Sequence, residues 1–156
     1  MVKKITTSTL ISYAIPLIIA LVIILDFSLP GKVYAEDAVT IEKELQRYYN
    51  AGGNYHYSYE VVTPERRFAV SETFANEVRG KSISYSVSLI FNQVNKHGLA
   101  NSSKTNIYSF RIASGLVYPL FVIFILFIHY KYNKNWTTLL FVLQVILLAD
   151  LFLVMN

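Results

Sequence analysis

The chain has 156 residues, of which 54% are hydrophobic and only 15% charged, and its formal net charge is +4. This charged fraction is low for a soluble protein, so many apolar side chains must face something other than water. The sequence has no cysteine, which excludes disulfides and cysteine-ligated zinc or iron–sulfur sites. The basic residues form no stripe with interleaved aromatic residues, so nucleic acid is not an expected partner.

Three long apolar runs dominate the sequence, at roughly 9–29, 112–130 and 136–155. Each is close to the ~20 residues that a helix needs to span ~30 Å of hydrocarbon. We therefore predict a membrane protein with three transmembrane helices and a small extracytoplasmic α+β domain that contains an antiparallel sheet. The predicted segments are a transmembrane helix or signal peptide at 1–30, the domain at 31–111, a transmembrane helix at 112–130, a cytoplasmic turn at 131–135 and a transmembrane helix at 136–156.

The first apolar run fits two functions. Lys3 and Lys4 precede it, and Val33-Tyr34-Ala35 resembles the small-x-small site at which a signal peptidase cuts. The run from Leu10 to Leu29 is also longer than the ~7–15 residues of a usual signal core, so it is long enough to remain as a membrane anchor. The mature protein therefore has three membrane helices if the segment is retained and two if it is cleaved.

The segment between the first two runs changes its hydrophobic period along the chain. Apolar residues at helical spacing predict a helix over 36–50, which Gly52 and Gly53 end. Strict alternation predicts strands from Asn54 to Glu60 and over "SISYSVSLI", residues 82–90, with Ile83, Tyr85, Val87 and Leu89 on the buried face. The other expected elements are a turn at Thr63-Pro64, a strand over 66–70, a helix over 71–78 capped by Ser71, a polar loop at 96–98 and 101–103, and a strand over 105–111.

Tyrosines are concentrated in the first half of this domain. Tyr48, Tyr49, Tyr55, Tyr57 and Tyr59 place five phenol rings within twelve residues. Tyrosine is favoured at protein interfaces and at the membrane surface, but alternate rings also form the core of small sheets. We expect the face of Tyr55, Tyr57 and Tyr59 to be mainly core and the remaining rings to form an interface.

Motifs that carry chemistry are weak throughout. "ANEVRGKS", residues 75–82, matches a relaxed phosphate-loop pattern, but that loop needs a strand before it and a helix after it. The expected order here is a helix and then a strand, so we predict no nucleotide binding. His56, His97 and His129 follow no metal-ligand spacing. We therefore predict neither a metal nor a cofactor. We do not expect an enzyme, and a hydrolase or transferase is the alternative.

Three polar residues interrupt the apolar runs: Asp26, Gln144 and Asp150. Polar groups in hydrocarbon are costly and usually face protein or water. Counting along the helices puts both aspartates in the outer part of the bilayer, where Lys32 and Arg111 are possible ion-pair partners. A proton-carrying carboxylate pair, a structural ion pair and side chains that reach the headgroups are the three alternatives.

The lysines indicate a topology. Lys3 and Lys4 precede the first run, and Lys131 and Lys134 lie in the short turn between the other two. Short loops rich in lysine stay in the cytoplasm, so residues 31–111 and the C-terminus are expected outside. A bacterial inner membrane is the preferred location.

Our leading functional hypothesis is a non-catalytic accessory or assembly subunit of a larger membrane complex in the cell envelope. Its expected partners are the lipid bilayer and other membrane subunits, which could approach at the small residues Ala113, Ser114 and Gly115. One alternative is a contribution to a proton or cation path through the three intramembrane polar residues. The other is an envelope sensor or binding module.

Overall fold

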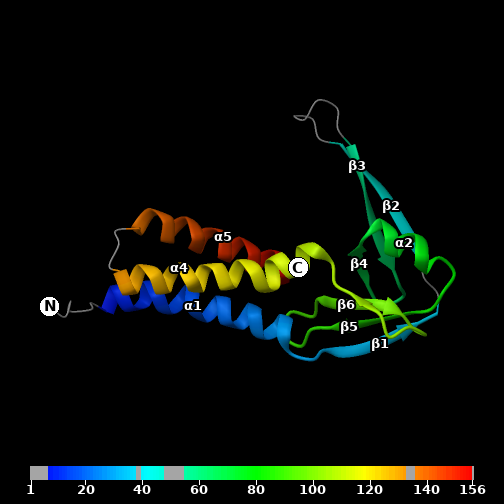
Figure 1. Ribbon diagram of the computed structural model, residues 1–156, viewed down its shortest axis with the longest axis horizontal. Coiled ribbons are helices and arrows are strands. Elements are labelled where there is room, and N and C mark those ends of the chain that lie inside the picture. Colours follow the sequence, from blue (N-terminus) through cyan, green and yellow to red (C-terminus); the bar gives the residue numbers. More distant parts are fainter. Residues whose placement is uncertain (1–6, 38–39, 48–54, 133–135, 156) are drawn as a thin grey trace. The chain divides into compact units, whose positions relative to one another are not determined.

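The computed structural model describes residues 7–37, 40–47, 55–132 and 136–155, and the chain forms two compact units (Figure 1). The helical unit comprises Met1–Pro30, Ser88–Gln93 and Ser109–Asn156. The sheet unit comprises Gly31–Val87 and Val94–Tyr108. The six-residue loop at 88–93 therefore belongs with the helices, although the strands on either side of it belong to the sheet unit.

The helical unit packs its long helices side by side (Figure 1). Its elements are α1 (Thr7–Ser28), α3 (Ser109–Ile112), the π-helical turn η1 (Ala113–Val117), α4 (Tyr118–Tyr132) and α5 (Thr137–Met155). The α3, η1 and α4 segments follow one another without a break, as one helix from Ser109 to Tyr132. The buried core of this unit is Ala20, Ile23, Val122, Leu126, Leu143 and Leu147.

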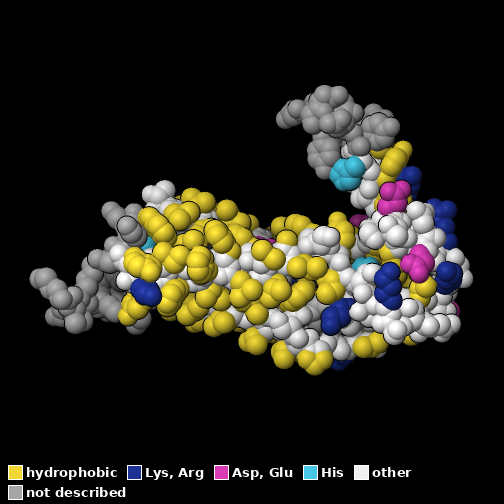
Figure 2. Space-filling view, in the orientation of Figure 1, with side chains coloured by type: hydrophobic (Ala, Val, Ile, Leu, Met, Phe, Trp, Pro, Cys, Tyr) yellow, Lys and Arg dark blue, Asp and Glu magenta, His cyan; other side chains and the backbone are white. Residues whose placement is uncertain are grey.

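Two of these helices, Ser109–Tyr132 and Thr137–Met155, are long and apolar enough to cross a membrane by length and composition. Only 33% and 17% of the residues in their most apolar stretches are buried inside the protein. Hydrophobic side chains consequently cover the face of the helices in Figure 2. The core helix of a soluble protein would be mostly buried, whereas these two helices leave much of their apolar surface exposed.

The sheet unit contains two antiparallel sheets. The first has the order β1-β5-β6-β7, and its strands are β1 (Lys32–Glu36), β5 (Ile83–Val87), β6 (Val94–Leu99) and β7 (Thr105–Asn106). The second has the order β2-β3-β4, and its strands are β2 (Thr40–Arg47), β3 (Tyr55–Val62) and β4 (Arg67–Val70). Helix α2 (Glu72–Val78) connects them in sequence, and its buried residues Phe74, Ala75 and Val78 join both sheets in one core.

Several local predictions are confirmed. Strands occupy the alternating segments at Tyr55–Val62 and Ile83–Val87, and a short strand follows at Arg67–Val70. Ser71 caps α2, because its side-chain oxygen accepts a hydrogen bond from the Phe74 amide at 3.3 Å. Leu89, expected on the buried face of its strand, is instead 55% exposed because β5 ends at Val87.

The helix predicted over 36–50 is wrong where the structure describes it. β1 ends at Glu36 and β2 runs from Thr40 to Arg47, while 48–50 lie outside the described residues. Lys43 interrupts the alternation of apolar and polar residues that would indicate a strand. It lies between Ile41 and Leu45 on the same face of β2, opposite Tyr59. Its ammonium group lies 3.7 Å from the ring centre of Tyr57. A lysine in such a cation–π contact occupies a position that pattern analysis assigns to the polar face.

Two other expectations are also wrong. The polar loop predicted at 96–98 is part of β6, and His97 is buried there. The strand predicted over 105–111 is limited to Thr105–Asn106, because helix α3 already begins at Ser109.

Gly98 is needed in β6, since a Cβ at this position would lie 2.6 Å from the Lys104 carbonyl oxygen.

Candidate functional site

The Asp26 carboxylate lies near the end of α1 and is completely buried. One of its oxygens, Oδ2, accepts a hydrogen bond from Arg111 Nη2 at 2.9 Å. The other, Oδ1, accepts hydrogen bonds from the backbone amides of Ile90 at 2.8 Å and Phe91 at 3.0 Å. Each oxygen therefore acts as an acceptor, which is the arrangement that stabilises an ionised carboxylate.

The two amides belong to the loop Ser88–Gln93. This loop is closed by hydrogen bonds from the Ser88 amide to the Gln93 carbonyl at 2.8 Å and from the Gln93 amide to the Ser88 hydroxyl at 3.0 Å. Phe91 packs against the core of the helical unit, whereas Leu89 and Ile90 are exposed. Asp26 thus anchors an apolar loop to the end of α1.

Arg111 connects this carboxylate to the next helix. It lies on α3, only 7% of its surface is exposed, and its guanidinium carbon is 5.8 Å from the ring centre of Phe27. Its charge also acts on Asp150, which lies on α5. One guanidinium therefore serves two carboxylates, and these three side chains carry a formal charge of −1 when both aspartates are ionised.

Asp150 and Ser114 are two further buried polar groups of the helical unit. Both are buried, with 9% and 5% of their surfaces exposed. The Ser114 hydroxyl acts on the Asp150 carboxylate, yet neither Ser114 Oγ nor Asp150 Oδ2 has a partner at hydrogen-bonding geometry. Ser114 lies in the π-helical turn η1, a type of irregularity that is frequent at functional sites.

The small residues of η1 allow α1 to approach closely. Gly115 is buried, and a Cβ at its position would lie 2.5 Å from Cδ2 of the Phe27 ring. Ala113 is exposed. The small-residue segment therefore contacts α1 of the same chain through Gly115, and Ser114 faces inward beside it.

Gln144 serves a different part of the unit. Its side-chain nitrogen donates a hydrogen bond to the Ser12 backbone carbonyl at 2.9 Å. In a regular helix this carbonyl would accept from the amide of residue 16, but residue 16 is proline and has no N–H. Gln144 therefore supplies the donor that Pro16 removes, and it links α5 to α1.

Two more polar groups link the helices. The Tyr118 hydroxyl donates to the Leu143 carbonyl at 2.9 Å, joining α4 to α5. The Tyr13 hydroxyl and His129 Nδ1 form a hydrogen bond between α1 and α4. Lys32, the other candidate partner of the aspartates, is exposed in β1 of the sheet unit.

The tyrosines of the sheet unit divide into two groups. Tyr59 is buried, and its hydroxyl donates to Glu72 at 2.7 Å, a bond to a carboxylate that raises the pKa of the phenol. Tyr57 is 43% exposed and lies opposite Leu45, which is 40% exposed. Tyr48 and Tyr49, and the side chain of Tyr55, lie outside the described residues. The Tyr59 ring therefore lies in the core, whereas the Tyr57 ring is partly exposed.

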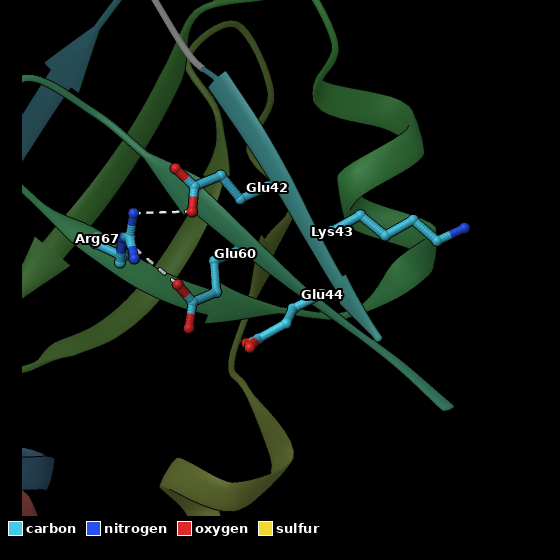
Figure 3. Close-up of a pocket in the computed structure, with 5 residues that line it drawn as sticks. All are labelled: Glu42, Lys43, Glu44, Glu60 and Arg67. Carbon is cyan, nitrogen blue, oxygen red and sulfur yellow. Dashed lines mark hydrogen bonds and ion pairs between the residues drawn. The ribbon is translucent and has the colours of Figure 1, made fainter. Parts of the chain in front are cut away.

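The other face of the β2-β3-β4 sheet carries an open pocket of about 370 Å³ lined by charged residues (Figure 3). Arg67 pairs there with Glu42 at 2.8 Å and with Glu60 at 3.6 Å, while Lys43 points away from them, on the other side of the sheet (Figure 3). The Arg67 and Glu42 side chains are 57% and 49% exposed. Exposed pairs of this kind contribute about 0–1 kcal/mol each, so we interpret the pocket as a solvated ion-pair network.

His97 and Tyr85 are the buried titratable groups of the first sheet. The His97 ring packs edge-on against Phe74, with ring centres 4.5 Å apart. Burial lowers the pKa of His97 from 6.5 to about 4, so the imidazole is neutral at physiological pH. Burial also raises the pKa of Tyr85, whose hydroxyl donates to Glu36.

The phosphate-loop-like segment has the order expected from its sequence. Helix α2 ends at Val78, Gly80 turns the chain at a φ of 69°, and strand β5 follows from Ile83.

No group of three or more histidine, aspartate or glutamate side chains among the described residues is arranged to hold a metal ion. No family model, curated protein or solved structure matches this chain.

Proposed function

We propose that this chain is a non-catalytic accessory or assembly subunit of a larger membrane complex in the cell envelope. The observation that supports this most is the use of polar side chains in the helical unit. Asp26, Arg111 and Gln144 each make a bond between segments of the anchor. They act as structural links, as polar residues between membrane helices commonly do.

A proton or cation path through Asp26, Gln144 and Asp150 has less support. Asp26 accepts hydrogen bonds from three N–H donors, and Gln144 donates one to the Ser12 carbonyl. Of these three residues, Asp150 is the one with a buried side-chain oxygen that has no hydrogen-bond partner. A sensor or binding module would need a ligand site, and the pocket at Arg67 is an exposed ion-pair network.

The proposed anchor has three helices, so the first apolar segment is retained. Cleavage after Ala35 would remove residues 32–35 of β1, which pair with Ser84–Val87 of β5. It would also remove Asp26 and leave the Arg111 charge buried without its partner, which is costly in an apolar interior. The intact mass of the purified protein tests this directly. We expect a mass that includes residues 1–35, and a chain that begins at Glu36 would contradict the proposed anchor.

The proposed orientation places the sheet unit outside the inner membrane of a bacterial cell. Lys131 in the last turn of α4 and the lysines near the N-terminus stay in the cytoplasm. Single cysteines at Asn101 and Asn133 test this, because the native chain has none. We expect an impermeant thiol reagent to label Asn101→Cys and not Asn133→Cys in intact cells. The opposite pattern would invert the topology.

A surface for a partner subunit is proposed at Leu45 and Tyr57. These two side chains are exposed, although they lie on the same face of the sheet as Ile41 and Tyr59, which pack into the core. Aromatic residues that are partly exposed beside a core are favoured at interfaces.

A photo-crosslinking amino acid tests this surface in cells. At position 57 it should give one adduct of defined mass. The same group at Thr73, which is exposed on α2, is the matched control and should give none. Absence of an adduct at 57, or the same adducts at both positions, would contradict an interface at this surface.

A further inference from the structure

The buried pair formed by Asp150 and Ser114 is not explained by a role in linking helices. In the helical unit, Asp26, Gln144, Tyr118 and Tyr13 each make a hydrogen bond to another segment. Asp150 Oδ2 and Ser114 Oγ are both shielded from solvent and make no such bond. A buried carboxylate and a buried hydroxyl are costly in an apolar interior unless each gains a hydrogen-bond partner.

The charges around Asp150 indicate how it gains such a partner. Among the described residues, Arg111 on α3 is the cation that acts on Asp150, and its Nη2 is bonded to Asp26 of α1 at 2.9 Å. Tyr118 on α4 is the other titratable group that faces Asp150, and a phenol is neutral at physiological pH. An ionised Asp150 would therefore leave one negative charge in excess among buried groups, which is unfavourable in a medium of low dielectric constant.

Both oxygens of Asp26 already act as hydrogen-bond acceptors. Its two oxygens accept hydrogen bonds from Arg111, Ile90 and Phe91, all of which are N–H donors. Asp150 has no N–H donor within hydrogen-bonding geometry at Oδ2. A carboxylic acid there could instead donate to Ser114 Oγ, because a hydroxyl oxygen is also an acceptor. Such a bond would satisfy both of the buried atoms.

We propose that Asp150 is a proton-binding site, in which the carboxyl takes up one proton from solvent and donates it in a hydrogen bond to Ser114 Oγ. The site rests on the three-helix anchor of the proposed function, since Asp26 of α1 is the carboxylate that accepts a hydrogen bond from Arg111. One proton is bound, one negative charge is removed, and no covalent bond between heavy atoms changes. The π-helical turn places Ser114 at the site.

Infrared spectroscopy of the full chain in lipid nanodiscs tests this site. At neutral pH we expect the carbonyl band of a protonated carboxylic acid. Labelling aspartate with carbon-13 at the side-chain carboxyl should shift this band without any mutation. Asp150→Asn should remove it, and Glu42→Gln, on the exposed sheet face, should leave it unchanged. Ser114→Ala should keep the band but move it to higher frequency, because the acid loses its acceptor.

Two results would overturn the proposal. One is the absence of an aspartic acid band in wild-type protein whose mass includes residues 1–35, which would show that Asp150 is ionised while the anchor itself is intact. The other is a thermal midpoint that rises when sodium replaces choline, with Asp150→Asn removing the rise, which would assign the site to a metal cation. A thermal midpoint that is the same in both salts supports a proton. A chain lacking residues 1–35 would instead contradict the proposed anchor.

Discussion

Gln144 offers the sharpest test of how polar side chains stabilise the helical unit. Replacing it with leucine removes the donor to the Ser12 carbonyl while keeping a side chain of similar size. Hydrogen bonds between helices in membranes contribute about 0.6 kcal/mol on average and up to about 1.7 kcal/mol. Since Pro16 cannot supply the usual amide, we expect a loss near the upper end, about 1–2 kcal/mol, in the free energy of unfolding.

A second substitution makes this a double-mutant cycle. Pro16→Ala restores an amide at the position from which a regular helix bonds the Ser12 carbonyl. In that background Gln144→Leu should cost less than about 0.5 kcal/mol, because the carbonyl keeps a donor. The four proteins would be compared by reversible unfolding in mixed detergent micelles. An equal cost of Gln144→Leu in both backgrounds would refute the assigned role of Gln144.

Three further predictions concern buried groups. Arg111→Met alone should lower the free energy of unfolding by about 3–5 kcal/mol, because it leaves Asp26 charged and buried. The double variant Arg111→Met with Asp26→Leu should lose less stability than this single change. A larger loss in the double variant would contradict the ion pair. His97 is protonated below about pH 6.5 in the unfolded chain but only near 4 in the folded one, so the free energy of unfolding should fall by about 2 kcal/mol from about pH 7.5 to 5. His97→Leu should flatten this part of the profile measured by chemical denaturation, and an unchanged slope would show that His97 is accessible. Gly115→Ala should lower the thermal midpoint, since its Cβ would lie 2.5 Å from the Phe27 ring. Phe27→Leu should partly restore the midpoint. An unchanged midpoint in Gly115→Ala would show that the Phe27 ring moves aside freely.

The elements with strong periodicity were predictable from the sequence. Long apolar runs mark the helices Ser109–Tyr132 and Thr137–Met155, because chain length alone relates a run to the thickness of a bilayer. The alternation of serine with apolar residues marks β5, since successive side chains in a strand point to opposite faces. The Ser71 cap was visible because capping depends on residues only three positions apart.

Elements that depend on tertiary contacts were not predictable in this way. Lys43 concealed the alternation of β2, because its favourable contact is the ring of Tyr57 on a neighbouring strand. His97 looked like a loop residue beside Lys96 and Gly98, but Phe74 of α2 packs on its ring. In both cases the deciding partner is distant in sequence, and a local pattern carries no information about it.

The candidate site shows the same division. The polar residues Asp26, Gln144 and Asp150 stood out because each interrupts an apolar run, and Arg111 was one of two possible partners. The contacts that these polar residues make could not be predicted from their spacing in the sequence. The amides of Ile90 and Phe91 reach Asp26 from a loop more than sixty residues away. The one available signal was Pro16, whose missing amide implies a carbonyl that needs another donor.

The central proposal, a subunit that functions within a larger membrane complex, is tested most directly by the mass of the native particle. The chain would be extracted from the membrane together with its lipids, without detergent, and weighed by native mass spectrometry. We predict a particle in which this chain and a second membrane protein are present in fixed stoichiometry, and which Tyr57→Ser weakens more than Thr73→Ser. A particle that contains only one copy of this chain and lipid would contradict the proposal.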